Sequence, residues 1–525
     1  MKKKQLIFVL AILLVFGSCL KAPQKASWDV SILAPLFKTT LGIGSFLADS
    51  LTTSDTSNLV HIVYNKALYE YSPASILELP DTITNQSYQS PFNITLQPGQ
   101  LFLNKTEQKQ YKFGDAKLLM IKVKSGFLKF QVSNPVHEAI LMTYSIPFAT
   151  KNGVSFEFTE LVPAATTVPY IFSKKIDISG FTIDMRGANG LGANLIGTNL
   201  KARLNPNGVA TPIAPLDVFV TYVKFDEFVL DYAKGYFSQT DINLEDTSHI
   251  DVFSIIKSGS FNLENINIGL DVVNGFGVDA QMAIDEMTSV NSKTGQNVLL
   301  HSAILGKNIN VMRALETGNP AVPVIPTIYP INFDNSNLKP MFENLPNKLY
   351  FKIHGQTNPM GNISGGNDFY YNGFGLKLML NLDIPISLKA NALMLVDTVK
   401  FNFNNNSDKN KITKGTFKLI ADNGFPFDAK VQLYMIDANN AVVDSLLFNN
   451  LVSEAPLGSN NIVNAVRRTV MDAPLPAAKL DKLYNTKKMA IKVIFQTNSS
   501  QYLKIYDFYK IDLKLTGDFD FLVQQ

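Results

Sequence analysis

Residues 274–284 read N-G-F-G-V-D-A-Q-M-A-I, residues 423–433 read N-G-F-P-F-D-A-K-V-Q-L, and residues 372–382 read N-G-F-G-L-K-L-M-L-N-L. In each stretch an Asn-Gly pair and a Phe are followed by apolar side chains that alternate with mostly polar ones. Alternation of period two is typical of a strand that buries one face and exposes the other to water. The sequence therefore predicts a mainly β fold of antiparallel sheets, with few helices.

The Asn-Gly pairs predict a turn or bulge in front of each strand, because Asn and Gly tolerate positive φ angles and the following Phe can fill the space beneath. A degenerate further copy is expected within 124–148, because Gly126-Phe127 precedes Asn134 much as Gly415-Thr-Phe417 precedes Asn423. This repetition predicts tandem β-sandwich modules, and ordinary hairpin turns are the alternative. The predicted bulge residues are Asn274, Gly275, Asn372, Gly373, Asn423 and Gly424.

The order of strand, Asn, bulge and strand resembles the immunoglobulin-like sandwiches of the late-embryogenesis-abundant type. This resemblance implies a fold and carries no function.

The domain limits are expected where prolines gather. Residues 318–330, GNPAVPVIPTIYP, predict a stiff, extended connector, and residues 211–215 a second boundary. The expected segments are a signal peptide at 1–18, a lipidated tether and first strand at 19–50, a β module at 51–215, a second at 216–317, the linker at 318–330, and one or more C-terminal β modules at 331–525. Short helices are expected over 43–51, 338–349, 460–471 and 477–488.

The first nineteen residues, MKKKQLIFVLAILLVFGSC, have the form of an export signal. A basic start precedes an apolar run that is too short to span a bilayer, and small residues follow it. Cys19 comes directly after them and is the only cysteine of the chain. We expect Cys19 to be the acylated residue of a lipobox, since several acyl chains anchor a protein firmly, and a chance free thiol is the alternative.

The residues that follow resemble the start of uncharacterised outer-membrane lipoproteins of the Bacteroidota, in which a lipidated Cys and a short tether lead into a W-D-V…P-L first strand. Here that strand would hold Trp28-Asp29-Val30 and Pro35-Leu36. The resemblance implies an outer-membrane location through acylated Cys19. In that group acidic residues after the Cys tend to mark export to the cell surface, whereas residues 20–27, LKAPQKAS, carry two Lys and no acid. The tether therefore favours the periplasmic face.

Charge argues against nucleic acid as a partner. The 525 residues include 47 Lys and Arg and 44 Asp and Glu, and the net charge of +3 is carried by Lys2, Lys3 and Lys4 of the leader. The chain after the leader is therefore neutral and offers no basic surface for phosphates.

No pattern of catalytic or metal-ligating residues is found. The five histidines have no ligand spacing, and no nucleophile, zinc or phosphate-loop motif is present. The glycine-rich stretch 187–197 is expected to be a flexible loop, and the Asn-rich stretch 402–410 a polar loop with too little charge for calcium. We expect no catalytic residue, no cofactor and no metal, and hence a protein that is not an enzyme.

Two features are candidates for binding. Aromatic side chains can stack against sugar rings, and the candidate platforms are Tyr370, Tyr371, Tyr506 and Tyr509. Residues 218–237 are dense in aromatics and predict buried strands or a surface that docks a partner. The leading hypothesis is a non-enzymatic outer-membrane lipoprotein that serves as a structural or accessory interaction module of an envelope complex. A glycan-binding lipoprotein of a nutrient-uptake system and a lipid-binding carrier are the alternatives.

Overall fold

The computed structural model describes residues 27–42, 44, 51–72, 77, 83–253, 256, 258–401, 403 and 410–524. Cys19 and the leader lie outside the described residues, as do most of the expected helix over 43–51 and most of the Asn-rich loop 402–410. Among the described residues, no helix is both long and apolar enough to cross a bilayer. The described chain is mainly β with antiparallel sheets, which confirms the predicted fold class.

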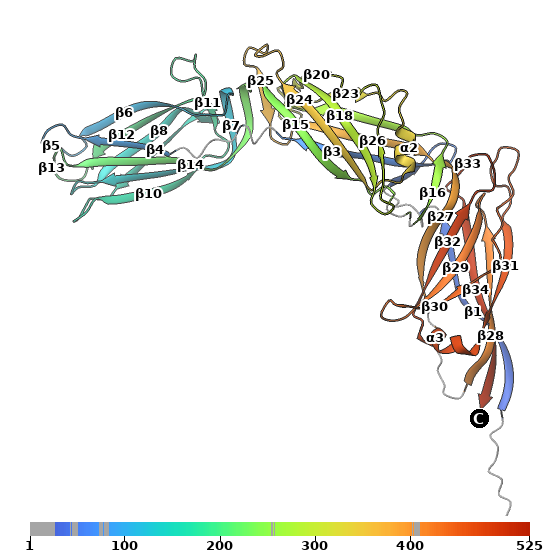
Figure 1. Ribbon diagram of the computed structural model, residues 1–525. Helices are drawn as coiled ribbons and strands as arrows, with labels where there is room; N and C mark the ends of the chain where they lie inside the picture. Colours follow the sequence, from blue (N-terminus) through green and yellow to red (C-terminus); the bar gives the residue numbers. More distant parts are fainter. Residues whose placement is uncertain are drawn as a thin grey trace, which may run out of the picture. The chain divides into compact units, whose positions relative to one another are not determined.

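The chain divides into two units, each made of segments that are distant in sequence. Unit 1 comprises residues 1–63, 251–267 and 383–525, and unit 2 comprises residues 64–250 and 268–382. Strand pairing resolves three sandwich modules, which we call inner, middle and outer (Figure 1).

The inner module is continuous in sequence and belongs to unit 2. Its strands are β4 (Ile83–Gln89), β5 (Ile94–Leu96), β6 (Leu101–Gln110), β7 (Lys117–Asn134), β8 (Ile140–Lys151), β9 (Val154–Val162), β10 (Tyr170–Asp177), β11 (Thr182–Asp184), β12 (Leu195–Leu204), β13 (Thr211–Ile213) and β14 (Val218–Tyr236). One sheet has the order β4-β14-β7-β10 and the other β6-β12-β8-β9, and β11 joins them by pairing with both β7 and β8.

The middle module takes its first strand from before the inner module and the rest from after it. Its elements are β3 (Val60–Tyr71), β15 (Thr240–His249), β17 (Asn267–Asn274), β18 (Ala280–Asn291), β19 (Gln296–Leu299), β20 (Ile309–Val311), β21 (Leu315–Glu316), β22 (Val324–Ile325), β23 (Thr327–Ile331), α2 (Leu338–Glu343), β24 (Lys348–Thr357), β25 (Asp368–Tyr371) and β26 (Leu376–Pro385). One sheet runs β3-β26-β17-β23, with β2 (Thr52–Ser54) beside β3, and the other runs β15-β24-β18, with β19 and β20 on β18.

The outer module encloses both others in sequence and lies in unit 1. Its elements are β1 (Ser27–Gly42), β16 (Ser258–Leu263), β27 (Ser387–Lys400), β28 (Asn410–Asn423), β29 (Asp428–Ile436), β30 (Val442–Leu447), β31 (Arg467–Leu475), the 3₁₀ helix η4 (Ala477–Lys479), α3 (Leu480–Asn485), β32 (Lys488–Gln496), β33 (Leu503–Lys504) and β34 (Lys510–Gln524). One sheet runs β1-β34-β28-β31, and the other runs β16-β27-β32-β29-β30.

The three modules therefore share one strand order and are nested within one another. In each module the first strand pairs with the last, as β4 with β14, β3 with β26 and β1 with β34. Figure 1 shows the consequence in the outer module, where the blue strand β1 lies among orange and red strands. The sequence predicted modules that follow one another, whereas the middle and outer modules each receive an insertion after their first strand. The outer module also takes β16 from between β15 and β17.

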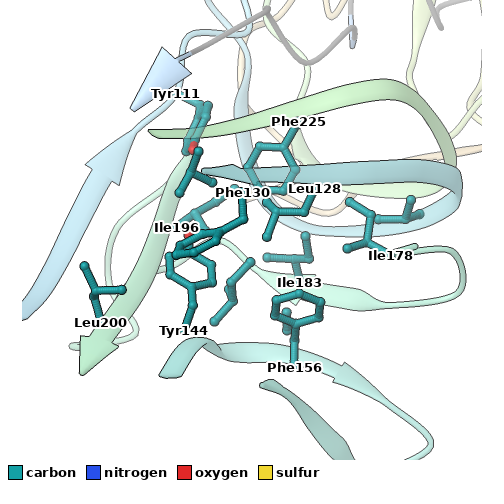
Figure 2. Close-up of a cluster of buried hydrophobic side chains, with 14 of the residues drawn as sticks. Tyr111, Leu128, Phe130, Tyr144, Phe156, Ile178, Ile183, Ile196, Leu200 and Phe225 are labelled. Atoms are coloured by element: carbon teal, nitrogen blue, oxygen red, sulfur yellow. The ribbon is translucent and has the colours of Figure 1, made fainter. Parts of the chain in front are cut away.

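The predicted alternation decides which side chains form the cores. Along β29 the buried residues Ala429, Val431, Leu433 and Met435 alternate with less buried ones. The inner core is rich in rings, and Figure 2 shows Phe130 beside Tyr144, with their centroids 5.3 Å apart. Burying each of these side chains stabilises the fold by roughly 1.5–3 kcal/mol. Because the chain has a single Cys and cannot form an internal disulfide, its stability depends on this burial.

The modules share a buried asparagine at the end of one strand, which we call the asparagine lock. In the outer module Asn423 ends β28 and is fully buried. Its side-chain oxygen accepts the N–H of Phe425 at 2.9 Å, and its amide donates to the carbonyl oxygens of Phe427 and Ser453, both at 2.9 Å. The N–H of Ala455 completes the lock by donating to the carbonyl of Phe425 at 3.0 Å.

The same bonds recur at Asn274 and Asn134. Asn274 bonds Phe276, Val278 and Met312, and Ala314 donates to Phe276. Asn134 bonds Val136, Glu138 and Pro163, and Ala165 donates to Val136. The degenerate copy expected within 124–148 is thereby confirmed as the lock of the inner module.

Asn372 is not a lock, and this corrects the prediction that grouped it with Asn274 and Asn423. Its side chain is only partly buried and donates to the carbonyl of Leu230 on β14. Gly373 has a φ angle of +88° in the turn between β25 and β26, so a turn does occur there. Asn372-Gly373 therefore resembles the lock sequences because it forms a turn between two strands, and it does not form a lock.

Gly275 and Gly424 are needed for a different reason than predicted, because neither has a positive φ angle. Gly424 donates its N–H to the carbonyl oxygen of Lys510 at 2.9 Å, and a Cβ atom would lie 2.8 Å from that oxygen. Gly275 makes the same bond to Gly375 at 2.8 Å. The glycines allow two backbones to approach closely at the start of the last strand.

Two expected helices are found in shortened form and one is absent. α2 ends at Glu343, ahead of Pro346, and η4 with α3 covers 477–485 of the expected 477–488. Residues 460–471 do not form the expected helix, since β31 begins at Arg467 and pairs with β28. From Met471 to Leu475, burial alternates with period two, which favours a strand.

Residues 318–330, expected to be a linker, lie within unit 2 and include β22 and most of β23. β23 is the edge strand beside β17. Prolines lack an N–H group and so are tolerated on an edge strand, which Pro330 illustrates. The proline-rich composition therefore reflects an exposed edge.

Candidate functional site

The middle module carries a short hairpin that starts at its asparagine lock. Asn274 binds the carbonyl of Met312, and Ala314 donates to Phe276, so the chain enters β21 from a fixed position. β21 pairs with β22, with Leu315 opposite Ile325. The lock thereby sets where this hairpin leaves the sandwich.

The hairpin and the adjoining β23 expose several large apolar side chains. Leu315 and Ile325 are 62% and 52% exposed, and Ile328 is 61% exposed. We call the exposed apolar side chains of residues 312–329 the hairpin surface: Leu315 and Ile325 form its central cross-strand pair, and Met312, Val322, Ile328 and Tyr329 are exposed in the same segment. Grouped apolar side chains of this size on an exposed surface are typical of a binding site.

The hairpin is held from below by a small core of its own. Ala314, Val324 and Phe369 are buried there, and the rings of Tyr232 and Tyr371 pack against them. The loop from 317 to 323 closes through a bond from the N–H of Thr317 to the carbonyl of Pro323 at 3.0 Å. A supported hairpin loses little conformational freedom on binding, which favours affinity.

A buried ion pair fixes the base of the hairpin. Asp368 is fully buried and accepts the N–H of Phe237 at 3.0 Å and the amide of Asn358 at 2.8 Å. Arg313 lies 3.4 Å from Asp368 and binds Asp279 through its backbone N–H and its guanidinium. Hydrogen bonds and the partly exposed Arg313 offset part of the cost of burying the Asp368 carboxylate.

Polar side chains gather around Glu316, which is opposite Val324 in the hairpin. The rings of Tyr232 and Tyr371 lie 4.6 Å apart on the paired strands β14 and β25. The Tyr371 hydroxyl donates to Glu316 at 3.0 Å, and Lys234 lies 3.8 Å from the same carboxylate. Burial, with the nearby charge of Glu316, raises the pKa of Tyr371 to about 12, so its hydroxyl stays a donor at neutral pH.

Of the four predicted sugar platforms, only Tyr371 keeps a partly exposed ring. Tyr370 is buried in the core of unit 2. Tyr506 and Tyr509 are also buried, and the Tyr509 hydroxyl accepts the N–H of Val463 at 2.9 Å. These three rings are buried and have no free face for a sugar.

The aromatic stretch 218–237 forms a single strand, β14, with a last turn into Phe237. Several of its rings are buried, Phe219 and Phe225 among them, as expected of core strands. In its C-terminal part, Tyr232 packs against the small core under the hairpin and Lys234 lies near Glu316.

The hairpin surface was not predicted from the sequence. A signal was present, because each lock is followed by V-x-x-A at 162–165, 311–314 and 452–455, whose Val pairs with the strand after the lock. Aligning these segments shows that only the middle module continues into an apolar hairpin from Leu315.

Within the described part of the chain, no group of three or more His, Cys, Asp or Glu side chains could hold a metal ion. The glycine-rich stretch 187–197 forms a loop that runs into β12.

Comparisons with known proteins give no family. No family model matches the chain, and no curated protein matches it. Among solved structures, a protein of Parabacteroides distasonis described as secreted aligns over 93% of this chain and 99% of its own, with 9% identity and a TM-score of 0.30. The VP1 pentamer of KI polyomavirus covers 39% of this chain and 97% of its own with 10% identity, and the VP2 subviral particle of infectious bursal disease virus covers 92% and 86% with 10% identity. Their TM-scores are 0.08 and 0.09, and none of these likenesses carries an argument about function.

Proposed function

We propose that this chain is an exported, lipid-anchored interaction protein of the outer membrane that binds a protein partner through the hairpin surface. The observation that carries the proposal is the group of large apolar side chains exposed together on a supported hairpin. Many other large apolar side chains of unit 2 fill a common core, although exposed ones such as Leu216 also occur outside the hairpin.

The chemistry of the surface indicates a protein as the partner. A protruding apolar hairpin fits a groove lined by apolar side chains, and Tyr329 at its edge is of the residue type that dominates interface energies. Glu316, Lys234 and the two tyrosines form a polar rim that can select the orientation of the partner. The function is one of binding, and catalysis is not part of it.

Export and anchoring are supported by the sequence of the leader and by Cys19. The basic tether supports the periplasmic face of the outer membrane. Proteinase K should therefore spare the protein in intact cells and digest it in lysed cells. Digestion in intact cells would place it on the cell surface instead.

The binding proposal is tested by co-purification from mild detergent. The wild-type lipoprotein should be recovered with a partner, and Leu315→Ser combined with Ile325→Ser should lose it. Leu216→Ser is the matched control, because Leu216 is 90% exposed at a turn that is not part of the hairpin surface. A partner retained equally by all three proteins, or no partner with any of them, would contradict the proposal.

Glycan binding is a second candidate, favoured by the partly exposed Tyr371 ring beside Glu316. It predicts retention on polysaccharide gels that Tyr371→Ala abolishes and Leu315→Ser leaves intact. The opposite pattern would favour the protein partner.

A further inference from the structure

Unit 1 contains a cavity of about 70 Å³ that is lined by apolar side chains alone. Phenyl rings form much of its wall, together with leucine and isoleucine side chains. Most of the lining comes from the outer module, with Ile62 of β3 beside it, and includes Phe261, Leu395, Phe425, Phe427 and Phe495.

The asparagine lock of the outer module builds one wall. Asn423 binds the N–H of Phe425 and the carbonyl of Phe427, so both rings are held in place by backbone bonds. The ring of Phe495 lies 5.4 Å from that of Phe425 and 5.9 Å from that of Phe427. This wall is thus fixed by the fold.

The adjoining part of the wall comes from β16 and β27, strands of the same sheet as β32, which supply Phe261 and Leu395. β16 lies at the edge of its sheet, and its pairing with β27 contains a bulge between Ser258 and Ser260. Gly259 and Ala392 have φ angles of +92° and +51° at this bulge. A bulge interrupts the ladder of backbone bonds, so this wall can open locally.

The lining decides which ligands the cavity accepts. A buried water needs two to four polar partners, and this lining offers none, whereas apolar cavities bind small apolar molecules. The volume is roughly half that of an engineered cavity of about 150 Å³ that accepts benzene. It therefore suits the first few carbons of a linear chain better than a ring.

We propose that the outer module binds the end of one linear alkyl chain in this cavity. The site is separate from the hairpin surface, since all of its lining residues belong to unit 1 and the hairpin belongs to unit 2. Loss of partner binding would leave this inference unaffected.

The test titrates the full chain with butanoate, hexanoate, octanoate and decanoate and measures affinity by calorimetry. Each methylene group that enters the cavity should tighten binding about fourfold. Because the volume is small, the gain should end after the first few carbons. Leu395→Phe should weaken octanoate binding at least tenfold, because the added ring atoms occupy the cavity.

Leu447→Phe is the matched control, since Leu447 on β30 is exposed and away from the cavity, and it should bind as the wild type does. Phe427→Leu enlarges the cavity and should extend the gain to longer chains, which keeps the test decisive if Leu395→Phe fails to fold. Absence of binding, equal affinity for all chain lengths, or chain-length profiles in which both cavity variants match the wild type would overturn the proposal.

Discussion

The side-chain amide of Asn423 lies 2.9 Å from the backbone carbonyl oxygen of Ser453 and ties the end of β28 to the segment that follows β30. Asn274 is bonded to Met312 in the same way and at the same distance. The three locks thus define a common module, and in the middle module the lock also fixes the start of the hairpin surface.

Asn423→Ala should lower the free energy of unfolding by about 3 kcal/mol or more. It leaves the N–H of Phe425 and the carbonyls of Phe427 and Ser453 buried without partners, and each unsatisfied group costs about 1–3 kcal/mol. Chemical denaturation followed by circular dichroism measures the loss. Asn372→Ala is the control and should cost less than about 1 kcal/mol, since it removes one partly buried bond. Equal losses would show that the lock has no special role.

Gly424→Asn should destabilise the protein, whereas Gly373→Asn should leave its stability nearly unchanged. Asn adopts positive φ readily, so it should replace Gly373 within about 1 kcal/mol, with open space around the new Cβ. At Gly424 its Cβ would meet the oxygen of Lys510, and we expect a loss of roughly 1–3 kcal/mol. The two melting curves measure this directly. A tolerated Gly424→Asn would refute the close-approach explanation.

Acid should weaken unit 1 through Asp444 on β30. Its burial acts to raise the pKa, but the N–H of Ser445 and the ammonium groups of Lys479 and Lys482 outweigh that effect and hold the pKa at about 2. Because this lies below the ordinary value of 3.8, the carboxylate stabilises the fold above pH 3.8 and loses that effect as the pH falls toward 2.

Unfolding free energies of the wild type and of Asp444→Asn, measured from pH 7 to pH 2, test this assignment. The difference between the two proteins should shrink as the pH falls through that window. A difference that is constant with pH would mean that the charge of Asp444 is not what stabilises β30.

Local features of the fold were predictable from sequence, because they depend on neighbouring residues. Alternation along 429–435 and 278–284 identified the strands, and the spacing of Gly126 and Asn134 identified the lock of the inner module. Asn372 was wrongly grouped with Asn274. The two segments share the sequence N-G-F-G, but this sequence does not determine where the Asn side chain donates its hydrogen bonds.

Nesting was not predictable from local pattern. β1 pairs with β34, from Ser27 opposite Gln524 to Gly42 opposite Lys510, and this register is set by contacts across nearly the whole chain. The prolines of 318–330 led to the incorrect prediction of a linker. Edge strands and linkers both tolerate proline, because in both the backbone N–H needs no partner in a sheet.

The candidate site depended on burial, which the sequence gives only in part. Tyr370 and Tyr371 are adjacent in sequence, yet one ring is buried and the other is partly exposed. Leu315 and Ile325 read as core residues, but their strand pair lies on top of Ala314 and Val324 and turns them outward.

The central claim, that the hairpin surface binds a protein, is tested most directly by photo-crosslinking in intact cells. A photoreactive residue replaces Ile325 in one strain and Leu216 in another, both being exposed positions. The proposal predicts one discrete crosslinked protein from position 325 and none from position 216. No crosslink at 325, or the same products from both positions, would contradict it.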